Sequence, residues 1–210
     1  MTPRPLPLRF YARDTVQVAR GLLGRLLVST IGGRRCVARI VETEAYVGPH
    51  DPACHAAGWR RTPRTEVLYG EPGLAYVYFT YGMHWCVNVV TEREGFPAAV
   101  LLRALEPLEG LATMRRRRRT DAAELLAAGP ARLTQALGID RRLDGHPLTE
   151  PPLWIAAGRP VAPRRIVVGP RIGIREATDW PLRFYVTDNP FVSAGPGRTP
   201  PRTGSRWSAA

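Results

Sequence analysis

Strand-like segments separated by short turns run through most of this chain, and they restrict its fold more than any other feature. Residues 26–30 and 34–46 are joined by a Gly-containing turn, and only four residues separate 75–80 from 85–90. Both patterns are typical of β-hairpins. Residues 98–107 are almost continuously apolar and predict a buried strand. Antiparallel pairing therefore dominates the expected fold.

Helices are expected between these hairpins. Asp14 has the character of an N-cap for an amphipathic helix that begins at residue 15 and ends at Gly21 or Gly24. A helical region is expected from near Pro107 through five consecutive arginines, and Pro130 is placed for the first turn of another helix.

The end of the chain returns to strand-like patterns. Residues 164–174 and 182–187 predict two closing strands. Hairpins with helices inserted between them indicate an α+β fold rather than a doubly wound parallel sheet. We expect an N-terminal arm over residues 1–11, one domain over 12–194 and a disordered basic tail over 195–210.

The charge of the chain points to a polyanionic partner. The formal net charge is +12, and all 30 basic residues are arginine, so the chain has no lysine. Cationic side chains displace the counterions of a phosphate backbone. No apolar run approaches a membrane span, and the N-terminus has no signal-peptide core. A soluble, cytoplasmic protein is expected, with no membrane partner.

The chain has three cysteines, Cys36, Cys54 and Cys86, which are far apart in sequence and odd in number, so they do not indicate a disulfide framework. Cys54 and His55 match no standard zinc spacing. We expect reduced, packed thiols and neither a metal nor a cofactor.

Glu42, Glu44 and Tyr46 fall on one face of the strand predicted over residues 34–46, since strand side chains alternate. Paired glutamates commonly lie on a solvated edge. The apolar flanks place this face near the core, where an unpaired carboxylate is costly. Same-face carboxylates are also typical of glycosidases, so both a surface role and a catalytic role stay open.

Aromatic residues gather around the second hairpin. Tyr76 and Tyr78 share a face, Phe79 points away, and Tyr81 stands at the tip beside Gly82. These side chains are either core aromatics with a turn tyrosine, or a stacking shelf with a protruding wedge.

Isolated polar residues in apolar strands are further candidates. Asn88 needs a hydrogen-bond partner, either a ligand or a backbone group. Arg103 indicates either a carboxylate partner, such as Glu44 or Glu106, or a functional site. The five arginines 115–119 point in every direction on a helix, which indicates phosphate attraction or a solvated surface.

Seven segments together, and in this order, resemble the alkyladenine (3-methyladenine) DNA glycosylase family. They are RIVETEAYVGP, HAAGWRRTPR, PGLAYVYFTYGMHWCVNVV, AAVLLRALEPLEG, GPARLTQALGI, GPRIGI and PLRFYV. The resemblance spans residues 12–193. It implies a single mixed α+β domain with a curved antiparallel β-sheet, surrounding helices and a protruding β-hairpin, and an enzyme that flips damaged purines out of DNA.

The resemblance also implies roles for individual residues. Glu44 resembles the general base and Arg103 the arginine that orients the catalytic water. The resemblance assigns a base pocket to Tyr46, His55, Tyr78 and Asn88. It assigns DNA intercalation to Tyr81 and Met83. His84 stands where some members have an aromatic residue. For neutral lesions the proton donor is either His55 or a water.

The missing lysine sharpens the expected activity. Glycosylases that also cut the strand commonly use an amine, and here only the N-terminal amine is available. We therefore expect a monofunctional glycosylase. It is expected to act as a monomer on double-stranded DNA that contains damaged purines: 3-methyladenine, 7-methylguanine, hypoxanthine or ethenoadenine. The alternatives are a non-catalytic nucleic-acid-binding module and a hydrolase of free nucleosides that uses Glu42 and Glu44.

Overall fold

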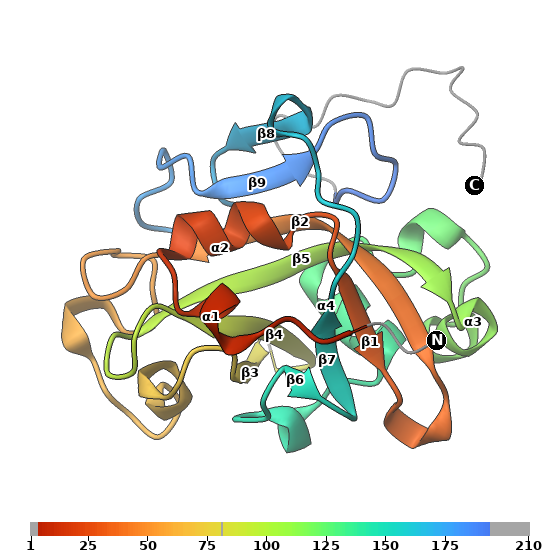
Figure 1. Cartoon of the computed structure of the whole chain (residues 1–210), viewed down its shortest axis with the longest axis horizontal. Helices are drawn as coiled ribbons and strands as arrows, with labels where there is room; N and C mark the ends of the chain where they lie inside the picture. The colour runs from red at the N-terminus through yellow and green to blue at the C-terminus, as the bar shows by residue number, and fades with distance from the viewer. Residues whose placement is uncertain (1–3, 81, 194–210) are drawn as a thin grey trace.

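The computed structural model describes residues 4–80 and 82–193. One curved antiparallel sheet organises this part of the chain, with its strands in the order β3-β4-β5-β2-β1-β7-β6, while β9 pairs with β2 and β8 with β9 (Figure 1). The strands are β1 (Leu26–Ser29), β2 (Cys36–Tyr46), β3 (Ala75–Thr80), β4 (His84–Thr91), β5 (Ala98–Glu109), β6 (Thr149–Glu150), β7 (Leu153–Ala156), β8 (Ile166–Gly169) and β9 (Arg183–Val186). The predicted α+β class is confirmed.

In the described part of the chain, four α-helices surround the sheet: α1 (Leu8–Tyr11), α2 (Thr15–Leu22), α3 (Leu111–Arg118) and α4 (Pro130–Leu137). The side chain of Asp14 accepts a hydrogen bond from the Gln17 amide, which confirms the predicted N-cap of α2. Helix α2 lies along β2, where the Thr43 hydroxyl donates to the Ala19 carbonyl at 3.0 Å. None of the helices in the described ranges is long and apolar enough to cross a membrane.

Short 3₁₀ turns occupy the connections: η1 (Ile31–Gly33), η2 (Ala57–Trp59), η3 (Glu66–Tyr69), η4 (Ala123–Leu125), η5 (Arg141–Leu143) and η6 (Pro163–Arg165). The segment predicted as an N-terminal arm touches the sheet, because Leu6 is buried and its amide donates to the Ile155 carbonyl. The tail predicted over 195–210 lies outside the described residues.

Strand β2 is the centre of the sheet. It pairs with β5 from Val37 to Tyr46, its first part also pairs with β1, and residues 42–44 also pair with β9. The register with β5 shifts on both sides of Glu42. At the second of these shifts, between Glu42 and Thr43, Arg103 of β5 has no residue of β2 directly opposite it. Bulges of this kind redirect side chains, often beside active sites.

Two predicted boundaries were wrong. The helix expected from Pro107 begins only at Leu111, because β5 continues to Glu109. Pro107 fits in this strand because it lies at a register shift, where a missing N–H is tolerated. The strand expected over 164–174 ends at Gly169, before Pro170, and the chain continues as a loop with Gly173 at φ 78°.

The run of arginines has a structural role that neither sequence interpretation included. Arg117 donates to the carbonyls of Ile31 and Ala136, and Arg118 donates to the Leu126 carbonyl. These bonds connect α3 to α4 and to the turn after β1. Two of the five side chains therefore hold the fold together, while Arg116 and Arg119 are exposed.

Candidate active site

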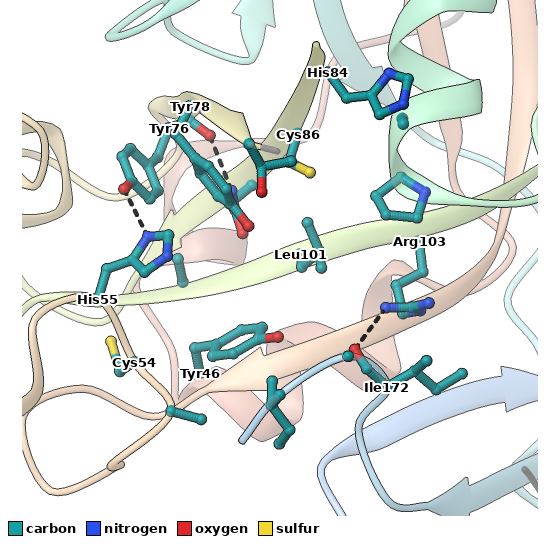
Figure 2. A pocket seen from close by; sticks show the side chains of 18 of the residues that line it. Tyr46, Cys54, His55, Tyr76, Tyr78, His84, Cys86, Leu101, Arg103 and Ile172 are labelled. Atoms are coloured by element: carbon teal, nitrogen blue, oxygen red, sulfur yellow. Dashed lines mark hydrogen bonds between the residues drawn. The ribbon is translucent and has the colours of Figure 1, made fainter. Parts of the chain in front are cut away.

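A cavity of about 910 Å³ opens beside the β3–β4 hairpin. Its volume is in the range of small-molecule sites, about 300–1,000 Å³. Figure 2 shows His55, Tyr76 and Tyr78 at one end, Arg103 and Ile172 at the other, and Tyr46 and Leu101 between them. The two ends differ in chemistry: the first is aromatic and the second is charged.

Glu44 anchors the charged end. Its carboxylate accepts hydrogen bonds from the Ile172 amide at 2.7 Å and from the Tyr46 hydroxyl at 3.1 Å, and it lies 3.2 Å from Nη1 of Arg103. Glu44 is 0 % exposed and does not itself line the cavity, whereas these three partners do. The carboxylate therefore lies directly behind the cavity wall.

Arg103 joins the two glutamates of β2. Its Nε lies 3.3 Å from Oε1 of Glu42, and its Nη1 also donates to the Ile172 carbonyl at 3.3 Å. The sequence left Glu44 or Glu106 as its partner. Glu44 is confirmed, while Glu106 pairs with Arg39 instead. The bulge in β5 explains how one guanidinium reaches both Glu42 and Glu44.

Glu42 has different surroundings from Glu44. It accepts hydrogen bonds from Nε of Arg183 at 2.6 Å and from the amide and hydroxyl of Ser193 at 2.7 and 3.0 Å. Like Glu44 it is fully buried, but none of these donors lines the cavity. The geometry thus separates a carboxylate beside the cavity from one enclosed in the fold.

Burial raises the pKa of Glu44 above that of an ordinary glutamate. The Arg103 guanidinium, the Ile172 amide and the Tyr46 hydroxyl oppose this effect, because each stabilises the ionised form. A buried carboxylate with such donors is suited to act as a base near neutral pH.

The aromatic end is built from the hairpin and from the loop after β2. The Tyr78 ring contacts the His55 ring edge-on at a centroid distance of 4.6 Å, and Tyr76 lies 5.3 Å from Tyr78. Both tyrosines line the cavity, while Phe79 packs on Trp85, as their alternation predicts. Tyr46 lies between the two ends, with Arg171 over its ring.

His55 is held as a neutral ring. Burial lowers its pKa to about 4, with help from the positive charges of Arg64 and Arg60. Its Nδ1 lies 2.8 Å from the Tyr76 hydroxyl, so the two side chains form a hydrogen bond at the aromatic end of the cavity.

The remaining predicted residues lie as follows. Asn88 lines the cavity, and its amide donates to the Tyr76 carbonyl at 3.0 Å, so a backbone group is its partner. Met83 is 68 % exposed near the hairpin tip, and His84 lines the cavity. Tyr81 lies outside the described residues.

Sequence reasoning missed three contributors. Ile172 acts through its backbone, which no side-chain pattern reveals. Asp51 and Arg171 form a buried ion pair behind Tyr46, although they are 120 residues apart. Arg64 lines the cavity and lies over the Tyr78 ring. Its position at the end of HAAGWRRTPR, the segment that begins with the predicted pocket histidine, was the available signal.

The three cysteines are buried and free, as predicted. Cys54 and Cys86 line the cavity. Within residues 4–80 and 82–193, no group of three or more His, Cys, Asp or Glu side chains is placed to hold a metal ion.

Together these features form a cavity with an aromatic end, arginines at its wall and a buried carboxylate behind it, as expected of an enzyme site. Residues 9–190 match the family model for methylpurine-DNA glycosylase. The chain belongs to the methylpurine-DNA glycosylase family. It is accordingly a DNA-repair enzyme, a hydrolase of N-glycosyl compounds.

Individual relatives agree with this assignment. A protein of Carboxydothermus hydrogenoformans is 51% identical over 90% of this chain and 98% of its own length. One of Myxococcus xanthus is 51% identical over 93% and 98%, and one of Rhodopseudomonas palustris is 50% identical over 90% of each chain. All three carry the name "Putative 3-methyladenine DNA glycosylase".

Proposed function

We propose that this protein removes alkylated or deaminated purines from double-stranded DNA by flipping the damaged nucleotide into the cavity and hydrolysing its N-glycosidic bond. The observation that carries the proposal is the position of Glu44, a buried carboxylate behind the wall of an aromatic-lined cavity. The proposed substrates are 3-methyladenine, the base in the relatives' printed name, with 7-methylguanine, hypoxanthine and ethenoadenine.

In this proposal Glu44 is the general base. A water on the cavity side, among Glu44, Arg103 and the Ile172 carbonyl, loses its proton to the carboxylate as its oxygen bonds to the anomeric carbon. The bond from that carbon to the base breaks, and the electron pair leaves with the base. General-base catalysis of this kind contributes about 10²–10⁴-fold.

Flipping takes the base out of the stack at a cost of a few kcal/mol. Tyr46 and Tyr78, with His55, form the proposed pocket walls, and stacking returns about 1–3 kcal/mol per base. Asn88 is proposed to reject normal guanine. Tyr81 and Met83 are proposed to fill the space left in the duplex, a role that for Tyr81 rests on the sequence.

The leaving base determines whether a proton is needed. A 3- or 7-alkylated purine is already cationic and departs readily, whereas hypoxanthine and ethenoadenine need protonation. The sequence left His55 or a water as the donor. Because burial holds the pKa of His55 at about 4, the ring is neutral at pH 7 and a poor acid. We therefore favour a water as the donor.

The test is base release from duplexes that each contain one of the four lesions, scored as alkali-labile abasic sites. We expect release with the strand intact until alkali is added, because the chain has no lysine for Schiff-base chemistry. Binding without any release would favour the non-catalytic module. Cleavage without alkali would assign the N-terminal amine as nucleophile.

A hydrolase of free nucleosides is the less favoured alternative. It would use Glu42 and Glu44 together, but Glu42 is enclosed by Arg183 and Ser193 away from the cavity. A free nucleoside also has no need of an exposed hairpin or of a net charge of +12. Release of base from single nucleosides at the rate seen with duplexes would restore this alternative.

A further inference from the structure

The loop after His55 leaves the cavity wall and returns to it at Arg64. His55 and Arg64 both line the cavity, while residues 56–63 do not. Within this loop Trp59, Arg60 and Arg61 are exposed. The loop therefore forms part of the rim on the side of the cavity that carries His55.

Trp59 has an unusual conformation for an exposed aromatic residue. It is 51 % exposed, and its φ of 64° lies in the left-handed region, next to Gly58 with the same φ. Side chains other than glycine rarely adopt this region, and glycine would fit it without strain. The indole contacts Phe96 only edge-on, at 5.9 Å between centroids. This contact leaves a large part of the ring uncovered.

The charges around Trp59 favour an anionic partner. No acidic residue occurs between His55 and Arg64, whereas Arg60, Arg61 and Arg64 follow Trp59 closely. Arg61 is paired with Glu66, and Arg64 lies over the Tyr78 ring. Arg60 has neither of these contacts and is exposed, so its guanidinium is the best placed of the three for a phosphate.

We propose that Trp59 and Arg60 form a second DNA contact outside the cavity, in which the indole packs against a nucleotide next to the flipped one and Arg60 binds a flanking phosphate. The inference rests on the proposed function, because the flipped nucleotide fixes where its neighbours pass the rim. An aromatic face beside a guanidinium is the usual combination for holding a nucleic-acid strand. The loop would thus grip the strand that carries the lesion.

The test compares wild type with Trp59→Ala, Trp59→Phe, Trp59→Gly and Arg60→Ala in binding to a duplex that contains a stable tetrahydrofuran abasic site. Leu8→Ala and Arg9→Ala serve as matched controls, because they remove an exposed apolar residue and its basic neighbour from α1, away from the cavity lining. Thermal unfolding is recorded for every variant.

We expect Trp59→Ala and Trp59→Gly to raise the dissociation constant on the order of 5- to 100-fold, and Trp59→Phe to raise it less. Arg60→Ala should lower the slope of log K against log salt by about 1, and Trp59→Ala should leave that slope unchanged. The variant Trp59→Gly separates binding from folding, since glycine suits the backbone at this position.

Two results would overturn the inference while leaving the proposed function intact. One is base release by wild type together with unchanged abasic-site affinity in Trp59→Ala and Trp59→Gly. The other is a loss of affinity that follows the loss of thermal stability in each variant, which would make Trp59 a folding residue. Failure of the proposed function is seen separately, as a wild type that releases no base from any lesion duplex.

Discussion

The two ends of the cavity are built in different ways. At the charged end, Glu44 is held by Tyr46 from its own strand, by Arg103 from β5 and by Ile172 from the loop after β8. At the aromatic end, ring contacts between His55, Tyr76 and Tyr78 prevail, and these residues come from one hairpin and one loop.

This difference separates chemistry from recognition. Two of the three donors to the Glu44 carboxylate, Arg103 and Ile172, come from distant parts of the chain, so its position depends on the whole fold. The rings of the aromatic end offer stacking area, which tolerates a change of ring better than a carboxylate tolerates loss of charge. Substitutions at the charged end should therefore affect rate or folding, and substitutions at the aromatic end should affect lesion binding.

The largest effect is expected for Glu44→Gln. The amide keeps the shape of the side chain but cannot take a proton from water, so base release should fall by about 10²–10⁴-fold. Binding to abasic-site DNA should persist. Single-turnover base release and equilibrium binding measure the two effects. Glu106→Gln is the matched control, because Glu106 pairs with Arg39 and does not line the cavity. Full activity of Glu44→Gln would remove the base role from this residue.

Glu42→Gln should lower the free energy of unfolding rather than act directly on base release. Loss of this charge breaks the buried ion pair between Glu42 and Arg183, and breaking a buried pair costs about 3–5 kcal/mol. Urea unfolding measures the change in the free energy of unfolding. The Glu106→Gln control should cost less than about 1 kcal/mol, since its pair with Arg39 is partly exposed. Unchanged stability with lost base release would reverse the roles of Glu42 and Glu44.

At the aromatic end, Tyr78→Ala should weaken binding of a lesion duplex by about 1–3 kcal/mol, the usual value of one stacking partner. Tyr78→Phe keeps the ring and should retain most of the affinity. Binding is best measured in the Glu44→Gln background, where the lesion stays intact. Equal losses in the two variants would mean that the hydroxyl, rather than the ring, holds the base.

Sequence patterns predicted the aromatic end more completely than the charged end. Alternation along one strand placed Tyr76 and Tyr78 on a single face, and the short turn fixed their hairpin. The need of Arg103 for a carboxylate was also predictable, although the sequence left both Glu44 and Glu106 open as its partner. The contribution of Ile172 was not predictable, because its backbone amide and carbonyl make the contacts. They also lie in a loop that the sequence assigned to a strand.

The fold shows the same limit. Local signals found the Asp14 cap, the hairpins and Pro130 at the start of α4. They missed β7, whose four buried residues follow two prolines, and they ended β5 too early at Pro107. Both errors concern strands that pair with a strand far away in sequence, β7 with β1 and the end of β5 with β2. Register shifts such as the one at Arg103 likewise depend on pairing between distant strands, which local periodicity does not contain.

The smallest expected effect is a shift in the pH at which the rate of base release falls. This shift distinguishes the two ends of the cavity, because each has its own titrating group: Glu44 at the charged end and His55 at the aromatic end. A carboxylate acts as a base only when ionised, so the rate falls as the pH drops through its pKa. Because burial raises the pKa of Glu44, this fall should begin at a higher pH than for an exposed glutamate, and should approach tenfold per unit below it. The single-turnover rate on 7-methylguanine measures this fall without a second proton transfer, since this cationic base needs no proton.

His55→Asn is the control. His55 has a pKa of about 4, so His55→Asn should leave the midpoint of the fall in place. A midpoint that moves in His55→Asn would show that the histidine, at the aromatic end, takes part in the proton transfer assigned to Glu44.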